Sequence, residues 1–287
     1  MKLLVTGLAG FTGQHLAPMA SAAGWQVIGL ECDITDAQAV QEAVDSHGVD
    51  AVLHLAGISF TAHPDSTEIY RVNTVGTTTL LNALANSPKR PSKVVLASSA
   101  SIYGNSDTVP ITESQPPAPT SHYGASKLAM EHLARTYTDR LPVVIVRPFN
   151  YTGPGQGSRF LVPKLAEHFA QKRPAIALGN LHVRREINDV RFVCEAYLQL
   201  LEAGQAGQTY NICTGVSYSV QDLLQAMTQI TGHEIEVTVD PAFVRRDELH
   251  ELYGDPTRLG QTVGPLTAYR LQDTLHSVLA SVQAQHG

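Results

Sequence analysis

The feature that most constrains the fold is an alternation of short apolar runs with segments of helical periodicity, which continues up to Pro148. Runs that are apolar on both faces and joined by helices form parallel sheets with right-handed crossovers. The expected strands and helices alternate at residues 2–6, 12–23, 27–31, 36–47, 51–56, 66–86, 93–99, 122–139 and 143–148. We therefore predict an α/β fold with a doubly wound parallel sheet, of the Rossmann type.

A second, smaller lobe is expected after this alternation. The pattern loosens into a Gly- and Pro-rich stretch at 148–157. Residues 192–203 are then typical of a helix and 209–213 of a strand, which we expect to pack back on the first lobe. The predicted division is a dinucleotide-binding domain, a returning segment and a substrate-binding lobe, at residues 1–152, 189–213 and 153–287.

Composition argues against several classes of function. A net charge of −6 without a basic run disfavours nucleic acid as a partner. No apolar run is long enough to cross a bilayer, so no membrane partner is expected. The three cysteines lie far apart and the histidines lack HExxH spacing, so no metal site is predicted. Residues 1–6 resemble the start of a signal peptide, but glycines interrupt the apolar run, and we expect a cytoplasmic protein.

A glycine-rich turn, TGLAGFTG at residues 6–13, follows the first expected strand and opens a helix. The amides and the dipole of such a helix terminus can bind a pyrophosphate, and Gly7, Gly10 and Gly13 let the backbone approach it. The spacing is GxxGxxG, and alone it would also suit a simple tight turn. Its position at the first strand-to-helix connection favours dinucleotide binding.

Acidic residues stand where a dinucleotide-binding fold commonly holds the adenosine ribose. Glu31 and Asp33 are both candidates, about 20 positions after the glycines. Between Lys2 and Arg71 the sequence contains no Lys or Arg that would pair with the 2′-phosphate of NADP. The pattern favours NAD(H) over NADP(H), although a basic residue from elsewhere in the chain would restore NADP(H) binding.

Tyr123 and Lys127 lie four residues apart on an expected helix and therefore share one face. An ammonium nearby favours a phenolate, so we expect Lys127 to lower the Tyr123 pKa from its ordinary value of about 10. Ser99 closes an expected strand at the ligand end of the sheet, where its hydroxyl can bind a substrate oxygen. YxxxK alone arises often by chance, but together with Ser99 and the glycine turn it predicts a catalytic site.

In this order the motifs resemble the extended short-chain dehydrogenase/reductase family, where TGxxGFxG, a Ser or Thr four residues before a YG pair, and YxxxK recur. The resemblance continues through HLAG at 54–57, VN at 72–73 and RPFN at 147–150. It implies that Ser99 and Tyr123 contact the reacting sugar oxygen, that Tyr123 transfers a proton, and that Lys127 holds the nicotinamide ribose. It also implies cofactor contacts from Gly7, Gly10, Phe11, Thr12, Gly13, Glu31, Asp33, Ile34, Leu55, Ala56, Gly57, Asn73, Tyr123, Lys127 and Pro148.

The resemblance also bears on the reaction. Ala100 and Ser101 follow Ser99 where nucleotide-sugar dehydratases of this family carry an acid. The second strand runs directly into Cys32-Asp33-Ile34, as in 4-keto-6-deoxy-sugar reductases. Epimerases of the family carry a further helix and strand between the second strand and the Asp-Ile pair. This implies an oxidoreductase that reduces the C4 ketone of a nucleotide-linked 4-keto-6-deoxyhexose with NAD(P)H. A nucleotide-sugar 4-epimerase acting on a UDP- or GDP-hexose with tightly bound NAD is the alternative. A non-catalytic nucleotide sensor is a third reading, which the intact catalytic residues disfavour.

The second lobe is similar to that of relatives acting on GDP-linked sugars, including the GDP-6-deoxy-4-keto-mannose reductases. On this resemblance Asn150 and Arg185 meet the sugar diphosphate, and Arg245 and Glu248 grip the phosphate and ribose of the nucleotide. The alternative is that these arginines form a solvated surface. Departures are Glu186-Ile187 in place of Asp and an aromatic, Arg246 in place of Pro, and His122 in place of the Pro before the catalytic Tyr.

Members of this family commonly pair helices into a four-helix bundle, so the resemblance implies a homodimer. An apolar stripe on the YxxxK helix is either part of that interface or ordinary core. It consists of Met130, Leu133, Ala134 and Tyr137.

Overall fold

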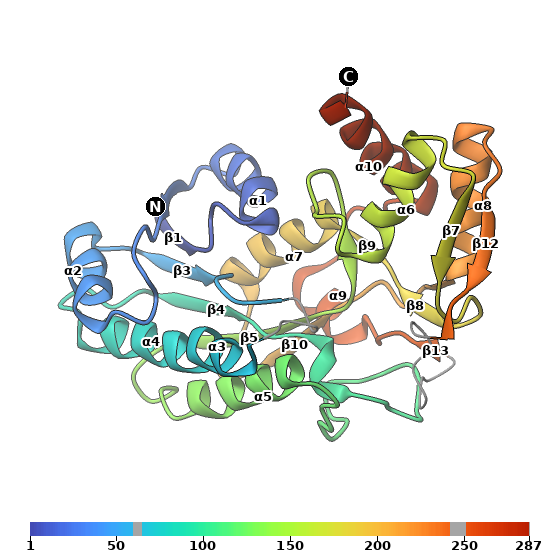
Figure 1. The fold of residues 1–287 in the computed structure, drawn as a ribbon. Helices are drawn as coiled ribbons and strands as arrows, with labels where there is room; N and C mark the ends of the chain where they lie inside the picture. The colour runs from blue at the N-terminus through green and yellow to red at the C-terminus, as the bar shows by residue number, and fades with distance from the viewer. Residues whose placement is uncertain (60–64, 242–250, 287) are drawn as a thin grey trace.

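The computed structural model describes residues 1–59, 65–241 and 251–286, and its larger lobe is built on one parallel sheet of six strands (Figure 1). The strand order is β10-β5-β4-β3-β1-β2. Their bounds are β1 (Lys2–Thr6), β2 (Gln26–Gly29), β3 (Ala51–His54), β4 (Lys93–Ala97), β5 (Val143–Pro148) and β10 (Thr209–Ile212). The predicted doubly wound α/β fold is confirmed. Because the chain passes from β1 to β2 on one side and to β3 on the other, the order reverses at β1, where such folds bind their ligands.

Helices cover both faces of this sheet (Figure 1). Successive strand residues point to opposite faces, so Leu3 and Val5 pack with α1 and α7, whereas Leu4 packs with α2 and α4. The helices of this lobe are α1 (Phe11–Ala22), α2 (Ala37–His47), α3 (Ser66–Tyr70), α4 (Thr77–Asn86), α5 (His122–Arg135) and α7 (Val190–Ala203).

The predicted helix at 66–86 is observed as three consecutive segments. A π-helical turn, η1 (Arg71–Gly76), separates α3 from α4. Such turns are rare and frequently mark functional sites, and this one contains Asn73. A second short element, the 3₁₀ turn η2 (Ala100–Tyr103), follows β4.

The second lobe has its own apolar core, formed by residues of α6, α8, α10 and β7. The elements outside the large sheet and its helices are β6 (Tyr151–Thr152), α6 (Leu161–Ala170), β7 (Ala175–Leu178), β8 (Arg184–Glu186), β9 (Asn188–Asp189), β11 (Ser217–Ser219), α8 (Val220–Thr231), β12 (Glu236–Val239), β13 (Glu251–Leu252), α9 (Thr257–Val263) and α10 (Leu271–His286). The chain returns to the large sheet in α7 and β10 before it completes this lobe. The division at residues 152 and 153 stays a prediction. Within the described ranges, no helix is long and apolar enough to span a membrane.

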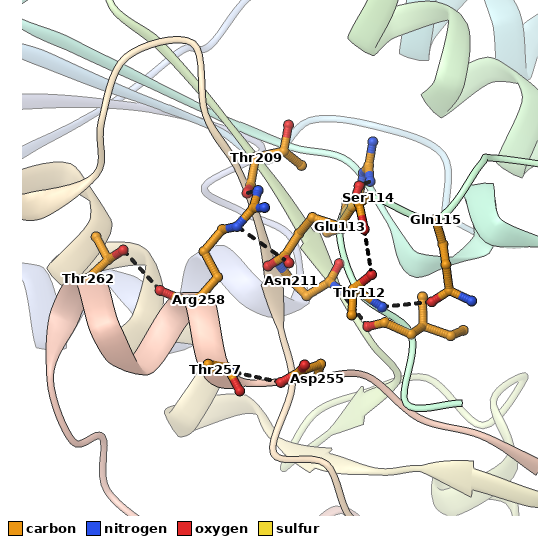
Figure 2. A network of polar contacts seen from close by, with 12 residues as sticks. Thr112, Glu113, Ser114, Gln115, Thr209, Asn211, Asp255, Thr257, Arg258 and Thr262 are labelled. Carbon is orange, nitrogen blue, oxygen red and sulfur yellow. Dashed lines mark hydrogen bonds and ion pairs between the residues drawn. The ribbon is translucent and has the colours of Figure 1, made fainter. Parts of the chain in front are cut away.

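A polar network joins the connection between β4 and α5 to α9 and β10 (Figure 2). Glu113 accepts a hydrogen bond of 2.9 Å from the Asn211 amide and lies 3.6 Å from the Arg258 guanidinium. Asn211 in turn accepts 2.8 Å from the Tyr103 hydroxyl. The long connection that leads to α5 is therefore anchored near its middle.

Candidate active site

Ser99 and Tyr123 meet at the carboxyl end of β4. Ser99 is the N-cap of η2, and its Oγ accepts 3.1 Å from the Ser101 amide. Tyr123 lies in the first turn of α5, whose N-cap Ser121 accepts 3.1 Å from the Gly124 amide. These two capping interactions orient both elements, and they bring the Ser99 hydroxyl close enough to the Tyr123 phenol to oppose the rise in the Tyr123 pKa. Their pairing is the arrangement that the sequence pattern predicts.

Lys127 lies one helical turn after Tyr123 and is almost completely buried, with 4% of its surface exposed. Its Nζ donates a hydrogen bond of 2.8 Å to the carbonyl oxygen of Ala97, the last residue of β4. Burial lowers the pKa of Lys127 to about 8, against the opposing attraction of the Glu131 carboxylate. A Cβ at Gly57 would come within 3.2 Å of the same Nζ, so Lys127 also faces the turn after β3.

The expected lowering of the Tyr123 pKa by Lys127 is wrong. Burial raises the pKa of Tyr123, because a phenolate would lose its hydration, and the hydrogen bond with Ser99 offsets only part of this rise. The ammonium of Lys127 is instead held at the Ala97 carbonyl. Tyr123 is therefore a protonated hydroxyl at neutral pH, which is the form that can donate a proton.

The glycine turn packs directly against the turn that follows β3. Gly7 has φ +71°, and a Cβ there would lie 2.8 Å from the Ala56 nitrogen. At Gly13 a Cβ would lie only 2.3 Å from the Leu8 carbonyl oxygen. Neither position accepts a side chain without backbone movement. The first turn of α1, capped by Gly10 with no side-chain bond to its amides, therefore presents backbone donors at the sheet's reversal point.

A buried histidine connects these two turns to η1. The Ala56 amide donates 3.0 Å to Thr6 Oγ1, which lies 2.6 Å from His54 Nδ1, and His54 Nε2 lies 2.7 Å from Thr77 Oγ1. Because Thr77 donates its own proton to the Asn73 carbonyl at 2.7 Å, His54 Nε2 must be the donor to Thr77, and Nδ1 accepts from Thr6. Burial, with a smaller contribution from the Lys127 charge, lowers the His54 pKa to about 3. The imidazole is thus neutral and fixed in one tautomer.

Asn73 links the turn after β3 to the catalytic helix. Its Oδ1 accepts 2.8 Å from the Ile58 amide, and its Nδ2 donates to the Ile58 carbonyl at 3.1 Å and to Ser126 Oγ at 3.0 Å. Ser126 donates 2.8 Å to the Tyr123 carbonyl. The side chain of Asn73, buried in η1, therefore holds both the turn after β3 and α5.

At the end of the predicted cofactor site that would hold the adenosine ribose, the expectation that no basic residue lies nearby is wrong. Arg71 of η1 lies 3.5 Å from Asp33 and donates 2.5 Å to Thr35 Oγ1. Both Glu68 oxygens also accept from this guanidinium, at 2.6 and 2.7 Å. Glu31 lies beyond the end of β2 and is exposed. Because Glu31, Asp33 and Glu68 together outnumber Arg71, this surface has a net negative charge.

Two further predicted cofactor residues, and Ser98 beside Ser99, are buried. Ile34 is buried against Gly76, and Pro148 ends β5 in a buried position. Ser98 Oγ is buried and has no hydrogen-bond partner among the described residues, as expected of a group that a ligand satisfies. In the same ranges, no group of three or more His, Cys, Asp or Glu side chains is placed to hold a metal ion.

The predicted substrate residues are only partly described. Asn150 is exposed just after β5, and its carbonyl accepts 2.8 Å from the Asn188 amide. Arg185 lies in β8, where it donates 2.8 Å to the Arg184 carbonyl. Arg245 and Glu248 lie outside the described residues.

Glu186, one of the departures noted in the sequence, is fully buried. It accepts hydrogen bonds from the Gly254 amide at 3.0 Å and from Thr214 Oγ1 at 3.1 Å. Burial raises its pKa, and these bonds oppose that rise. Its longer side chain thus anchors residues near Gly254 to β8.

Tyr151 is a residue that the sequence did not single out. Its hydroxyl oxygen lies 2.8 Å from Thr12 Oγ1, in the first turn of α1. The two residues are 139 positions apart in the chain, and no local pattern signals such a pair.

Comparisons with known proteins identify the family of this chain. Residues 3–213 match the NAD dependent epimerase/dehydratase family. GDP-6-deoxy-D-talose 4-dehydrogenase of Aggregatibacter actinomycetemcomitans is 35% identical over 269 residues, which cover 92% of each chain. GDP-6-deoxy-D-mannose reductase of Pseudomonas aeruginosa is 31% identical, with 99% of this chain and 98% of the relative covered. The solved structure of RMD from Pseudomonas aeruginosa complexed with NADPH is 31% identical, covers 99% of each chain and superimposes with a TM-score of 0.92. This chain therefore belongs to the NAD dependent epimerase/dehydratase family, within the extended short-chain dehydrogenases/reductases, and is an NAD(P)-dependent enzyme.

Proposed function

We propose that this enzyme reduces the C4 ketone of a GDP-linked 4-keto-6-deoxyhexose. The observation that carries the proposal is the convergence of Ser99, Tyr123 and Lys127 at the end of β4, where Lys127 donates to the Ala97 carbonyl and the Ser99 hydroxyl lies near the Tyr123 phenol. Two relatives above 30% identity over nine-tenths of the chain or more act on GDP-linked 6-deoxyhexoses. Their names support both the GDP moiety and redox chemistry at this class of sugar.

In this proposal each catalytic residue has one task. The nicotinamide cofactor, when bound, supplies the hydride. Ser99 and Tyr123 donate hydrogen bonds to the ketone oxygen, and Tyr123 passes its proton to that oxygen as it becomes an alkoxide. The raised Tyr123 pKa keeps this proton in place at neutral pH. Lys127 binds the nicotinamide ribose, for which its buried ammonium is placed beside Gly57.

The glycine turn, Asn73 and Ser98 support a dinucleotide site. The charge at the adenosine end of this site favours NADH over NADPH. Glu31, Asp33 and Glu68 outnumber Arg71 at the adenosine end, so the 2′-phosphate of NADPH would meet a negative surface. Because the related RMD was solved with NADPH, both cofactors must be compared. We expect a lower Kd for NADH.

The second candidate is a nucleotide-sugar 4-epimerase, which the family also includes by name. Both reactions need Ser99, Tyr123 and Lys127. The sheet ends at β2, without a further strand beyond it in the described residues, and this shortened edge favours the reductase. Incubation with NADH or NADPH and the GDP-linked 4-keto sugar should consume the reduced cofactor in stoichiometric amounts. Release of stoichiometric NAD on denaturation, together with interconversion of a UDP- or GDP-hexose and its 4-epimer, would instead establish the epimerase.

We also propose a homodimer formed through α5 and its neighbour helices. Leu133 on α5 is 38% exposed and Val75 in η1 is 53% exposed, so apolar side chains are available on this face. The other members of the predicted stripe are core residues of the protomer: Met130, Ala134 and Tyr137. Sedimentation at micromolar concentration should give a dimer, and Leu133→Glu should give a monomer.

A cytoplasmic location remains part of the proposal and is tested by fractionating cells that express the protein.

A further inference from the structure

Tyr151 connects the start of the second lobe to the turn that opens α1. It lies in β6, immediately after Asn150, and pairs in register with Asn188 of β9. From there its hydroxyl oxygen reaches within 2.8 Å of Thr12 Oγ1. Its ring also stacks on Phe11, with centroids 6.0 Å apart and an interplanar angle of 17°. Two consecutive residues of the first α1 turn are therefore in contact with one tyrosine.

Helix α7 holds the same turn from a second direction. Cys194 Sγ, completely buried, donates to the Thr12 carbonyl at 3.8 Å. Tyr197, 1% exposed, lies close enough to Tyr151 to affect the pKa of its hydroxyl. Thr12 is thus bonded through both its side chain and its carbonyl.

The amides of this turn are the ones available to a pyrophosphate. The intrahelical bond from the Gln14 amide to the Gly10 carbonyl, at 3.0 Å, begins the ladder of α1. The amides of Phe11, Thr12 and Gly13 precede it, and the first amides of any α-helix have no intrahelical acceptor. The direction in which they point depends on how the turn is held.

We propose that Tyr151 is a positioning residue for the dinucleotide, which acts through Thr12 by fixing the first turn of α1 relative to the catalytic residues. The inference rests on the proposed dinucleotide-dependent function. A negative charge on Tyr123 would also raise the pKa of Tyr151. The geometric basis is the contact of Tyr151 with Thr12 and Phe11, in the turn that receives the pyrophosphate in the proposed function.

The hydroxyl pair is neutral over the working range of pH. Burial raises the pKa of Tyr151 to about 12, although the hydrogen bond with Thr12 opposes the rise. Removal of this hydroxyl should therefore weaken cofactor binding without moving the pH profile of catalysis. In contrast, a substitution that changed the pKa of Tyr123 would shift the pH profile of catalysis.

The test is the Kd for NADH and NADPH, measured by quenching of protein fluorescence in the full-length wild type and in Tyr151→Phe, Thr12→Val and the double variant. Each single variant should raise the Kd about 3- to 10-fold, the usual effect of one neutral hydrogen bond. The double variant should be no worse than the worse single one, because both remove the same bond. Thr12→Ser, which keeps the hydroxyl, should bind within about twofold of wild type.

Tyr137→Phe is the matched control. It removes a tyrosine hydroxyl just beyond the C-terminus of α5 that donates a hydrogen bond of 2.7 Å to Asn82 of α4, and it should leave the Kd unchanged. Wild-type Kd values in Tyr151→Phe and Thr12→Val, even with a lowered melting temperature, would overturn the inference alone. Single effects that multiply in the double variant would also overturn it. A wild type that binds neither cofactor would overturn the proposed function as well.

Discussion

The ammonium of Lys127 and the carbonyl of Ala97 are joined by a hydrogen bond of 2.8 Å, which ties the helix that bears Tyr123 to the strand that leads to Ser99. The lysine is thus placed by the backbone of β4 before any ligand contacts it. Its charge is costly to bury, and this lowers its pKa to about 8.

The first prediction concerns the pH dependence of cofactor affinity. As pH rises through about 8, Lys127 loses its proton, so NADH affinity should fall above this pH. Lys127→Met should bind more weakly at neutral pH and should lose this dependence, while Lys89→Met, at an exposed ion pair with Asp50, should retain it. Titrations of Kd between pH 6 and 10 check this. An unchanged pH dependence in Lys127→Met would assign it to another group.

The second prediction concerns proton transfer. Tyr123→Phe should lower kcat by about 10²- to 10⁴-fold, because it removes the general acid. Ser99→Ala should lower kcat as well, since it removes one donor to the developing alkoxide. Both variants should bind NADH within about twofold of wild type, and steady-state kinetics beside fluorescence titration separates the two effects. A Tyr123→Phe variant with wild-type kcat would exclude this tyrosine as the acid.

The third prediction concerns acid stability. The His54 pKa falls from 6.5 to about 3 on burial, so between these values the unfolded chain binds a proton that the folded chain does not. The free energy of unfolding should therefore decrease as pH falls below about 6.5, by about 1.4 kcal/mol per pH unit from this group. His54→Gln should flatten this part of the curve. Urea unfolding at several pH values measures it, and identical slopes in both proteins would contradict the account.

The fourth prediction concerns the buried ion pair between Glu131 of α5 and Arg147 of β5. Arg147 Nε and Nη2 donate to the two Glu131 oxygens at 2.9 and 2.7 Å, and Glu131 is completely buried. Arg147→Met should cost about 3–5 kcal/mol in unfolding free energy, because it removes both hydrogen bonds from a buried carboxylate and leaves it only the longer contact of 3.6 Å with Arg135. The double variant Arg147→Met/Glu131→Leu should recover part of that loss. A double variant less stable than Arg147→Met would contradict this expectation, because removing the buried carboxylate should relieve the cost of burying its charge.

Much of the fold was predictable because its signals are local. The strands of the large sheet follow from apolar runs, and parallel strands gather their carboxyl ends at one edge, so Ser99 and the glycine turn had to lie near each other. Tyr123 and Lys127 share a helix face for the same kind of reason.

Other features depend on contacts between distant segments. Arg71 contacts Asp33 because the fold brings η1 beside the turn after β2. Tyr151 contacts Thr12 because β6, which pairs with β9 outside the large sheet, comes close to the start of α1. The raised pKa of Tyr123 depends on its burial, which the YxxxK spacing does not encode. The π turn at Asn73 and the single tautomer of His54 likewise follow from tertiary hydrogen bonds.

The most direct test of the proposed reaction follows the hydride. The enzyme would be incubated with a GDP-linked 4-keto-6-deoxyhexose and with NADH or NADPH deuterated at the transferable position of the nicotinamide. The proposal predicts a GDP-6-deoxyhexose with one deuterium, at C4, and one oxidised cofactor for each product, with neither formed by Tyr123→Phe. Unchanged 4-keto sugar and unconsumed cofactor, with both bound to the enzyme, would contradict it.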